Sequence, residues 1–131
     1  MIGGARAGIA AAMVLASALS GQAQEEQAQE GQAVTKGTGA VLRTLDKMEG
    51  ATRDMELRSG ESGTLNRMDI TLRECRYPTD NPAGEAYAYL VIQDREAGTT
   101  AFEGWMLATS PALNPLDHPR YDVWVLRCTT P

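Results

Sequence analysis

The feature that most constrains the fold of this chain is a series of short strand-like runs separated by turn residues, with no long amphipathic helical run between them. The clearest run is LNRMDITLRECRY, residues 65–77, in which Met68, Ile70 and Leu72 alternate with polar residues. Alternation with a period of two places successive side chains on opposite faces of a strand, so this run predicts a strand with one buried face. Chains made of such runs pack sheet against sheet or close a sheet on itself.

Turn signals divide most of the other runs into hairpins. AVLRTLDK and ATRDMELRS flank Gly50, which tolerates the positive φ of a tight turn, and AYAYLVIQD and TTAFEGWMLA flank REAG. AYAYLVIQD is apolar on both parities, which predicts a strand covered on both faces or central in a barrel. YDVWVLRC supplies the last strand. A length of 131 residues allows one core, so we expect an all-β domain, a single small sandwich or barrel of about six strands.

The segment TSPALNPLDHPRY, residues 109–121, is the least strand-like part of the domain. Ser110 and Asn114 each precede a proline, and such residues cap helix N-termini while proline suits the first helical position. The sequence therefore predicts two successive one-turn helices, a short helical corner before the last strand, followed by a turn at Asp117-His118-Pro119.

The N-terminal residues have the pattern of a secretory signal peptide. Arg6 precedes a small, apolar run at residues 8–20, and GQA supplies small residues for cleavage after Ala23. The run is about 13 residues, shorter than the roughly 20 that span a bilayer, so a retained anchor is the weaker alternative. We expect a signal peptide at 1–23, a flexible, low-complexity lead at 24–38 and a β-domain at 39–131, with periplasmic localisation and no stable membrane anchor after cleavage.

The two cysteines, Cys75 and Cys128, both follow the predicted signal peptide. In an exported chain two cysteines most simply form one disulfide, and the alternatives are a reactive thiol pair or a metal site. Neither a C-x-x-C motif nor a full set of metal ligands is present, so no metal site is expected. Cys75 lies on the opposite parity from Met68, Ile70 and Leu72. Either a β-bulge turns it inward or the disulfide lies outside the main core.

The charge of the chain limits its partners. The net charge is −5, and removal of Arg6 with the signal peptide makes the mature chain more acidic. Nucleic acid and anionic membrane surfaces are therefore poor partners. No phosphate-binding loop or dinucleotide motif is present, so no cofactor is expected, and an envelope protein is the expected partner.

A hydrolase interpretation would centre on His118, the only histidine, with Ser110 as the nucleophile and Asp117 or Asp122 as the residue that orients the imidazole. No G-x-S-x-G motif is present, and Ser110 is better explained as a helix cap. We therefore expect no catalytic residue and no enzymatic activity.

The aromatic residues are the better candidates for binding. Trp105, Trp124 and Phe102 fall inside predicted strands, and we expect them in the core because they offer the largest apolar area. Tyr87 and Tyr89 share one strand face and are predicted to be partly exposed contact residues.

Several of these segments resemble a family of small exported proteins of alphaproteobacteria that is known only as a domain of unknown function. The resemblance covers about residues 40–128 and is carried by FEGWM, SPAL (residues 110–113), DHP (117–119) and DVWVLRC (122–128), with Arg73 and Cys75 upstream. It implies export and a cysteine pair, and it implies no activity.

The leading functional hypothesis is a periplasmic, non-enzymatic β-domain that binds or scaffolds in the cell envelope. The alternative is a small secreted inhibitor or ligand-binding module that uses the loop at 110–121, with Ser110, Asp117, His118 and Tyr121 as contacts. A hydrolase centred on His118 is the third hypothesis.

Overall fold

A computed structural model describes residues 3–4, 8 and 31–131 of the chain. The predicted signal peptide and the first residues of the predicted lead fall almost entirely outside this part, so both remain predictions. Residues Gln32–Pro131 form one compact unit. Among the described residues, no helix has the length and apolar character needed to span a membrane.

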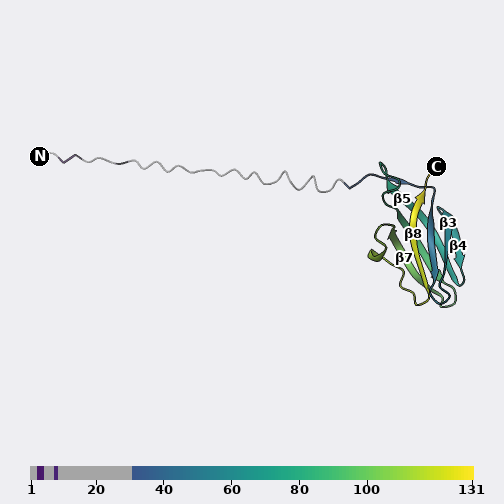
Figure 1. Cartoon of the computed structure of the whole chain (residues 1–131). Helices are drawn as coiled ribbons and strands as arrows, with labels where there is room; N and C mark the ends of the chain where they lie inside the picture. Colours follow the sequence, from purple (N-terminus) through teal and green to yellow (C-terminus); the bar gives the residue numbers. More distant parts are fainter. Residues whose placement is uncertain (1–2, 5–7, 9–30) are drawn as a thin grey trace. The chain divides into compact units, whose positions relative to one another are not determined.

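The compact unit consists of two antiparallel sheets (Figure 1). The larger sheet has the order β1-β5-β6-β7, and β4 shares with β1 the edge of β5 that faces away from β6. The smaller sheet has the order β3-β2-β8. The strands are β1 Val34–Lys36, β2 Gly39–Asp46, β3 Ala51–Arg58, β4 Ser62–Leu65, β5 Met68–Pro78, β6 Tyr87–Asp94, β7 Thr99–Leu107 and β8 Tyr121–Thr129. The all-β prediction is confirmed, and of its two forms the structure is the sandwich.

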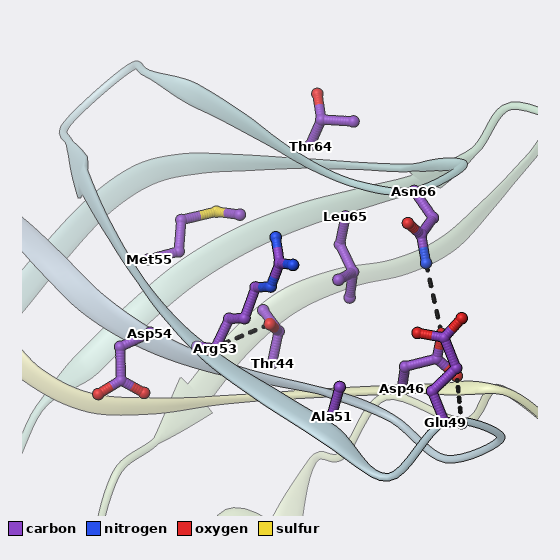
Figure 2. Close-up of a pocket in the computed structure, with 10 residues that line it drawn as sticks. All are labelled: Thr44, Asp46, Glu49, Ala51, Arg53, Asp54, Met55, Thr64, Leu65 and Asn66. Atoms are coloured by element: carbon purple, nitrogen blue, oxygen red, sulfur yellow. Dashed lines mark hydrogen bonds between the residues drawn. The ribbon is translucent and has the colours of Figure 1, made fainter.

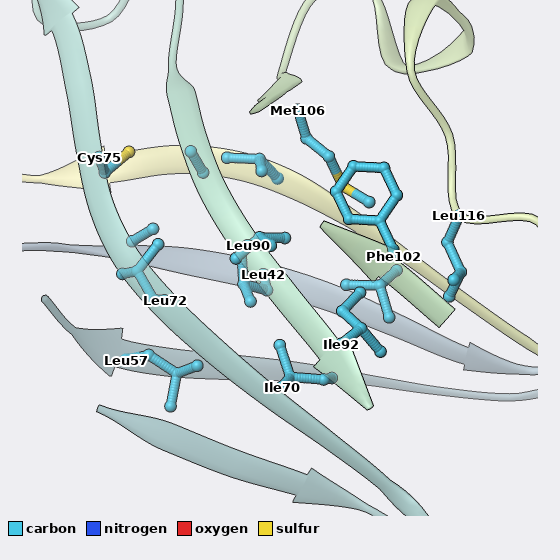
Figure 3. Packing of buried hydrophobic residues seen from close by; sticks show 14 of the residues in the cluster. Leu42, Leu57, Ile70, Leu72, Cys75, Leu90, Ile92, Phe102, Met106 and Leu116 are labelled. Carbon is cyan, nitrogen blue, oxygen red and sulfur yellow. The ribbon is translucent and has the colours of Figure 1, made fainter. Parts of the chain in front are cut away.

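The core lies between the two sheets, where inward-facing side chains of alternate positions meet (Figure 3). β5 contributes Met68, Ile70 and Leu72 and β6 contributes Leu90 and Ile92, all fully buried. The smaller sheet contributes Leu42, Leu57, Val123 and Val125. The alternation predicted for β5 is confirmed. β6 is buried on one face and half-buried on the other, so it is not covered on both faces.

Both predicted hairpins are present, and their turns are built alike. The β2–β3 turn has the sequence DKMEG and the β6–β7 turn has the sequence DREAG. In each turn the glycine N–H donates to the backbone carbonyl of the aspartate at 2.8 Å, and Gly50 and Gly98 each have a φ of 67°. Each aspartate, Asp46 and Asp94, also accepts hydrogen bonds from the two backbone N–H groups that lie two and three residues ahead.

Two strands were not predicted. β1 lies within the predicted flexible lead at 24–38, so the part of the lead at 34–36 is a correction: it pairs with Pro78, Tyr77 and Arg76 of β5. With only three residues and Val34 43% exposed, β1 has no alternation to reveal it. After β1 the chain crosses between sheets at Gly39, where a Cβ would collide with the carbonyl oxygen of Leu57. β4 has four residues and is equally short.

The corner between β7 and β8 differs from the prediction of two capped helices. It contains one 3-10 turn, Pro111–Leu113, and the side chain of Ser110 makes no capping hydrogen bond. No helix follows Pro115. The side-chain amide of Asn114 instead donates to the carbonyl oxygen of Trp105 at 2.9 Å, and Leu116 is buried in the core. These two anchors hold the second half of the corner in an extended form.

A β-bulge in β5 decides the position of the disulfide. The register with β6 shifts between Leu72 and Glu74, so Cys75 joins the buried parity and is fully buried. Cys75 is bonded to Cys128 of β8, which links the two sheets. The predicted disulfide is therefore present in the structure. Of the two alternatives for Cys75, a β-bulge or a disulfide outside the main core, the structure has the β-bulge.

The disulfide joins residues 53 positions apart, and in the loop-entropy model such a link stabilises the fold by about 4 kcal/mol. Replacing both cysteines, Cys75→Ala with Cys128→Ala, is expected to lower the free energy of unfolding by about this amount. Urea unfolding followed by tryptophan fluorescence measures the change. A reductant should destabilise the wild-type chain and leave the double variant unaffected. A wild-type unfolding midpoint that stays the same after the reductant is added would contradict the prediction.

Candidate binding face

The outer face of the larger sheet carries a group of half-buried side chains that we call the aromatic shelf: Arg76, Tyr87, Tyr89 and Trp105. They come from three adjacent strands. Arg76 of β5 is paired with Tyr87 of β6, and Tyr89 of β6 is paired with Trp105 of β7. Paired residues of an antiparallel sheet point to the same side, so the four side chains share one face.

The members of the shelf hold one another in place. The rings of Tyr89 and Trp105 meet edge to face, with centroids 5.3 Å apart and planes at 80°. The guanidinium of Arg76 lies over the Trp105 ring, 5.0 Å from its centroid. Edge-to-face ring pairs and cation–π contacts of this kind restrict the motion of the side chains while leaving them partly exposed. The shelf is therefore a preorganised surface.

A charged pair borders the shelf at β5. Glu74 accepts a hydrogen bond from Arg76 at 2.6 Å and lies 3.3 Å from the ammonium of Lys36. Burial of the Glu74 carboxyl acts to raise its pKa, but the hydrogen bonds from Lys36 and Arg76 outweigh it and lower the pKa below its usual value. The guanidinium of Arg76 is thus fixed on one side by a carboxylate and on the other by an aromatic ring.

The shelf contains a shallow hollow of about 190 Å³ lined by Val34, Arg76, Tyr87 and Trp105. Its lining consists of one aliphatic side chain, two aromatic side chains and one arginine. Its volume is smaller than the roughly 300–1,000 Å³ of typical small-molecule sites.

Both tryptophans lie outside the core, so their predicted core positions are wrong. Trp105 and Trp124 are half-buried on outer sheet faces. The inward positions of β7 belong to Phe102, which is buried as predicted, and Met106. Trp105 stands on the opposite parity from both, and that parity was visible in the sequence.

Trp124 lies beside the corner on the outer face of the smaller sheet. It lines a hollow of about 310 Å³ with Pro111, Ala112 and Pro115 of the corner and the start of β8. Nearby, Leu113 is 73% exposed. This second apolar surface belongs to the 110–121 loop that the sequence suggested as a contact region.

His118 is buried at the end of the corner, with both ring nitrogens occupied. Nδ1 accepts hydrogen bonds from the backbone N–H groups of Arg120 and Tyr121, both at 3.1 Å, and Nε2 lies 3.1 Å from Oδ2 of Asp94. Because Nδ1 accepts from two donors, Nε2 is the ring nitrogen that donates to Asp94. His118 is 7% exposed, and both of its ring nitrogens are engaged within the protein. Ser110 makes no hydrogen bond to it in the described part of the chain.

The corner also contacts the other hairpin turn, and we call the group formed by Asp46, Asp94, His118, Arg120 and Tyr121 the clamp. Arg120 donates to Asp46, with its Nη2 2.9 Å from Oδ2, and its guanidinium lies 5.1 Å from the centroid of the Tyr121 ring. The hydrogen bond from Arg120 is the main cause of a lowered pKa at Asp46. At Asp94 the backbone N–H of Ala97 and the contact with His118 lower the pKa. Both carboxylates are almost fully buried and paired.

A third hollow, of about 240 Å³, opens between β3 and β4 next to this cluster. Figure 2 shows Asp46 and Asn66 meeting at one end of it and Met55 at the other. The amide of Asn66 donates to Asp46 at 3.4 Å. Across residues 31–131 and the three described residues before them, no group of His, Cys, Asp and Glu side chains is arranged to hold a metal ion.

The structure separates the predicted contact residues into three places. Tyr87 and Tyr89 lie together in the shelf and are half-buried. His118 and Tyr121 also lie together, with ring centroids 5.2 Å apart, but both are buried in the clamp and offer no contact surface. Ser110 and the exposed Asp117 stay on the corner.

Sequence reasoning missed the roles of Arg76 and Trp105 in the shelf and of Asp46 and Asp94 in the clamp. The signal for the clamp was the repeated D-x-x-x-G turn, which occurs in both hairpins. The signal for Arg76 was hidden, because the parity of β5 changes at the bulge.

The fold and the shelf define a small, disulfide-bonded β-sandwich domain with an aromatic outer face. The chain belongs to the bacterial family described as "Uncharacterized protein conserved in bacteria (DUF2155)", whose model matches residues 40–128. This confirms the resemblance to a domain of unknown function, while export remains a prediction.

One relative is Uncharacterized protein RP359 of Rickettsia prowazekii (strain Madrid E), which is 26% identical over 94 residues. The match covers 70% of this chain and 61% of the relative, so the chain spans about three-fifths of the relative's length. No solved structure matches the chain.

The two carboxylates of the clamp allow a prediction of how the free energy of unfolding depends on pH. Because the pKa values of Asp46 and Asp94 are lowered in the folded chain, the fold favours their ionised forms. This stabilisation is present above the unfolded pKa of about 4 and is lost as the pH falls through the folded values. Urea midpoints measured from pH 7 to pH 3 should therefore fall steeply below about pH 4.

Two variants test this assignment. The variant Asp94→Asn should be less stable than the wild type at pH 7, and its free energy of unfolding should decrease less on acidification. The variant Asp117→Asn changes an exposed corner residue and should show the pH dependence of the wild type. Equal acid sensitivity in Asp94→Asn would refute the assignment.

Proposed function

We propose that this domain is a non-enzymatic, protein-binding module of the bacterial cell envelope, and that the aromatic shelf is its contact surface. The observation that carries the proposal is the composition of the shelf: two tyrosines, a tryptophan and an arginine on one face of a sheet. Tyr, Trp and Arg are the residue types most enriched among the residues that dominate protein–protein binding energy.

The shape of the shelf supports a protein partner over a small molecule. Its hollow is shallow and holds about 190 Å³, too little to surround a metabolite. A projecting side chain of another protein fits such a hollow, with the rings of Tyr87 and Trp105 as walls. Because Arg76 and Trp105 are already fixed by their own contacts, little side-chain entropy is lost on binding.

The partner we propose is a protein segment that presents one apolar side chain to the hollow and polar groups to its rim. The rim has charges of both signs, since Lys36 and Glu74 lie on one side and Glu103 accepts from Tyr89 on the other. Envelope localisation rests on the predicted signal peptide, and the disulfide supports an oxidising compartment.

The corner offers a second candidate surface for the alternative module. Trp124 is half-buried beside the loop, and Leu113 is 73% exposed. A tryptophan exposed next to this loop is the feature that would favour binding through residues 110–121. The corner lacks the mutual ring contacts of the shelf, so we rank it second.

Site-specific photocrosslinking tests the proposal in the cells that produce the full chain. A benzophenone residue at Tyr89 is expected to form a discrete protein adduct. Trp105→Ala should reduce that adduct at least tenfold, since truncating a dominant contact costs about 2 kcal/mol or more. The probe at Thr52, on the outer face of β3, is the matched control and should give no adduct.

The outcomes separate the candidates. An adduct that forms at Leu113 and not at Tyr89 would assign binding to the corner. A Tyr89 adduct that survives Trp105→Ala, or one that contains only glycan, would overturn a protein-binding shelf. Immunoblots and mass spectrometry of the adducts measure each result.

A further inference from the structure

The edges of the two sheets are protected in different ways. A sheet edge presents unpaired backbone N–H and C=O groups, and proteins shield it with short strands, charges or covering loops. β1 and β4 have three and four residues. β7 is contacted by the corner near its end, where the side chain of Asn114 donates to the carbonyl of Trp105. β3 is charged along its length, with Arg53, Asp54, Glu56 and Arg58.

β8 is less protected on the edge opposite β2, because the corner lies beside only its first residues and its charged residues, Asp122 and Arg127, lie near its two ends. It is nine residues long, and Val123 to Leu126 are four consecutive apolar residues. The N–H of Val123 donates to the side chain of its neighbour Asp122 at 3.0 Å, so it faces the free edge and not β2. Because alternate residues of an antiparallel strand point their backbone groups the same way, Val125 also faces that edge. No strand of the described chain pairs with it.

The charges of β8 complement a second copy of the same strand. The register with β2 shifts at the bulge between Val41 and Leu42, so Asp122, Trp124 and Arg127 are all paired with outward-facing residues of β2. The strand thus carries an acid near its start, a base near its end and a tryptophan between them on one face. If two such strands lie antiparallel, each Asp122 lies toward the Arg127 of the other copy.

We propose that β8 pairs antiparallel with β8 of a second copy of this chain, which joins the two three-stranded sheets into one continuous sheet. The contact is isologous, so it closes after two copies and does not propagate into a fibre. It adds backbone hydrogen bonds along the only long apolar edge among the described strands. It also covers Trp124, which is half-buried in the single chain.

This contact is independent of the proposed shelf function. The shelf lies on the outer face of the larger sheet, whereas β8 belongs to the smaller one. Pairing through β8 leaves both shelves of the dimer accessible, so the assembly presents two copies of the binding face.

The test exchanges the charges at the two ends of β8 in the full chain. A benzophenone residue replaces Leu126, and two differently tagged copies are produced in the same cell. The wild-type strand should give an adduct of twice the chain mass that carries both tags. Asp122→Arg alone, or Arg127→Asp alone, should reduce it roughly tenfold by placing like charges opposite each other. The double exchange restores opposite charges at both ends and should restore the adduct.

Matched controls keep the result independent of folding. The same probe at Glu56 on the charged β3 edge should give no two-tag adduct. Trp105→Ala should leave the Leu126 adduct unchanged, which separates this contact from the shelf. An intact disulfide and resistance to protease establish that each variant is folded. The absence of a two-tag adduct from the wild-type strand would overturn the proposal. So would a folded double exchange that fails to recover it.

Discussion

The rest of the structure depends on one extra residue in β5. The shift between Leu72 and Glu74 reverses the parity of everything that follows in the strand. Cys75 therefore enters the core and reaches Cys128, while Glu74 and Arg76 turn outward. In an unbroken alternation the two charged side chains would face the apolar core and the cysteine would face solvent. Burial of unpaired charges is far too costly for a domain of this size. One bulge thus supplies both the link between the sheets and the charged side of the shelf.

The last residues of β2 and β6, Asp46 and Asp94, make the same two kinds of contact. Asp46 and Asp94 each close their own hairpin turn through Oδ1 and contact the corner through Oδ2, and Arg120 also donates to Oδ1 of Asp46. Arg120 and His118, two residues apart, are the partners. The corner is thereby fixed to both sheets at the point where the chain enters β8. Asn114, His118 and Arg120 each have a structural partner there, so the imidazole of His118 is held by backbone N–H groups and by Asp94.

The strands could be predicted from the sequence where one face of the strand is buried against the core. The alternation at Met68, Ile70 and Leu72 and the glycines of the two turns were sufficient for β5 and for both hairpins. Prediction failed where tertiary contacts decide the outcome. β1 is held by its pairing with the end of β5 and not by its own residues, and Asn114 gives up a capping role to cover the edge of β7. Tyr87 and Tyr89 were placed correctly on one half-exposed face, but Arg76 could join them only after the bulge.

The positions of the two tryptophans follow from the parity of β7 and β8. Two sheets pack about 10 Å apart, and here the space is filled by aliphatic side chains together with the rings of Tyr77, Phe102 and Tyr121. The inward positions of β7 and β8 are taken by Phe102, Met106, Val123 and Val125, so Trp105 and Trp124 lie on the outer faces. Full burial of such a side chain contributes roughly 2–3 kcal/mol, and this domain forgoes part of that contribution twice. Each tryptophan then lies on a different sheet, which leaves the two outer faces chemically distinct: one with an aromatic group fixed by its neighbours, the other with an indole beside an unpaired edge.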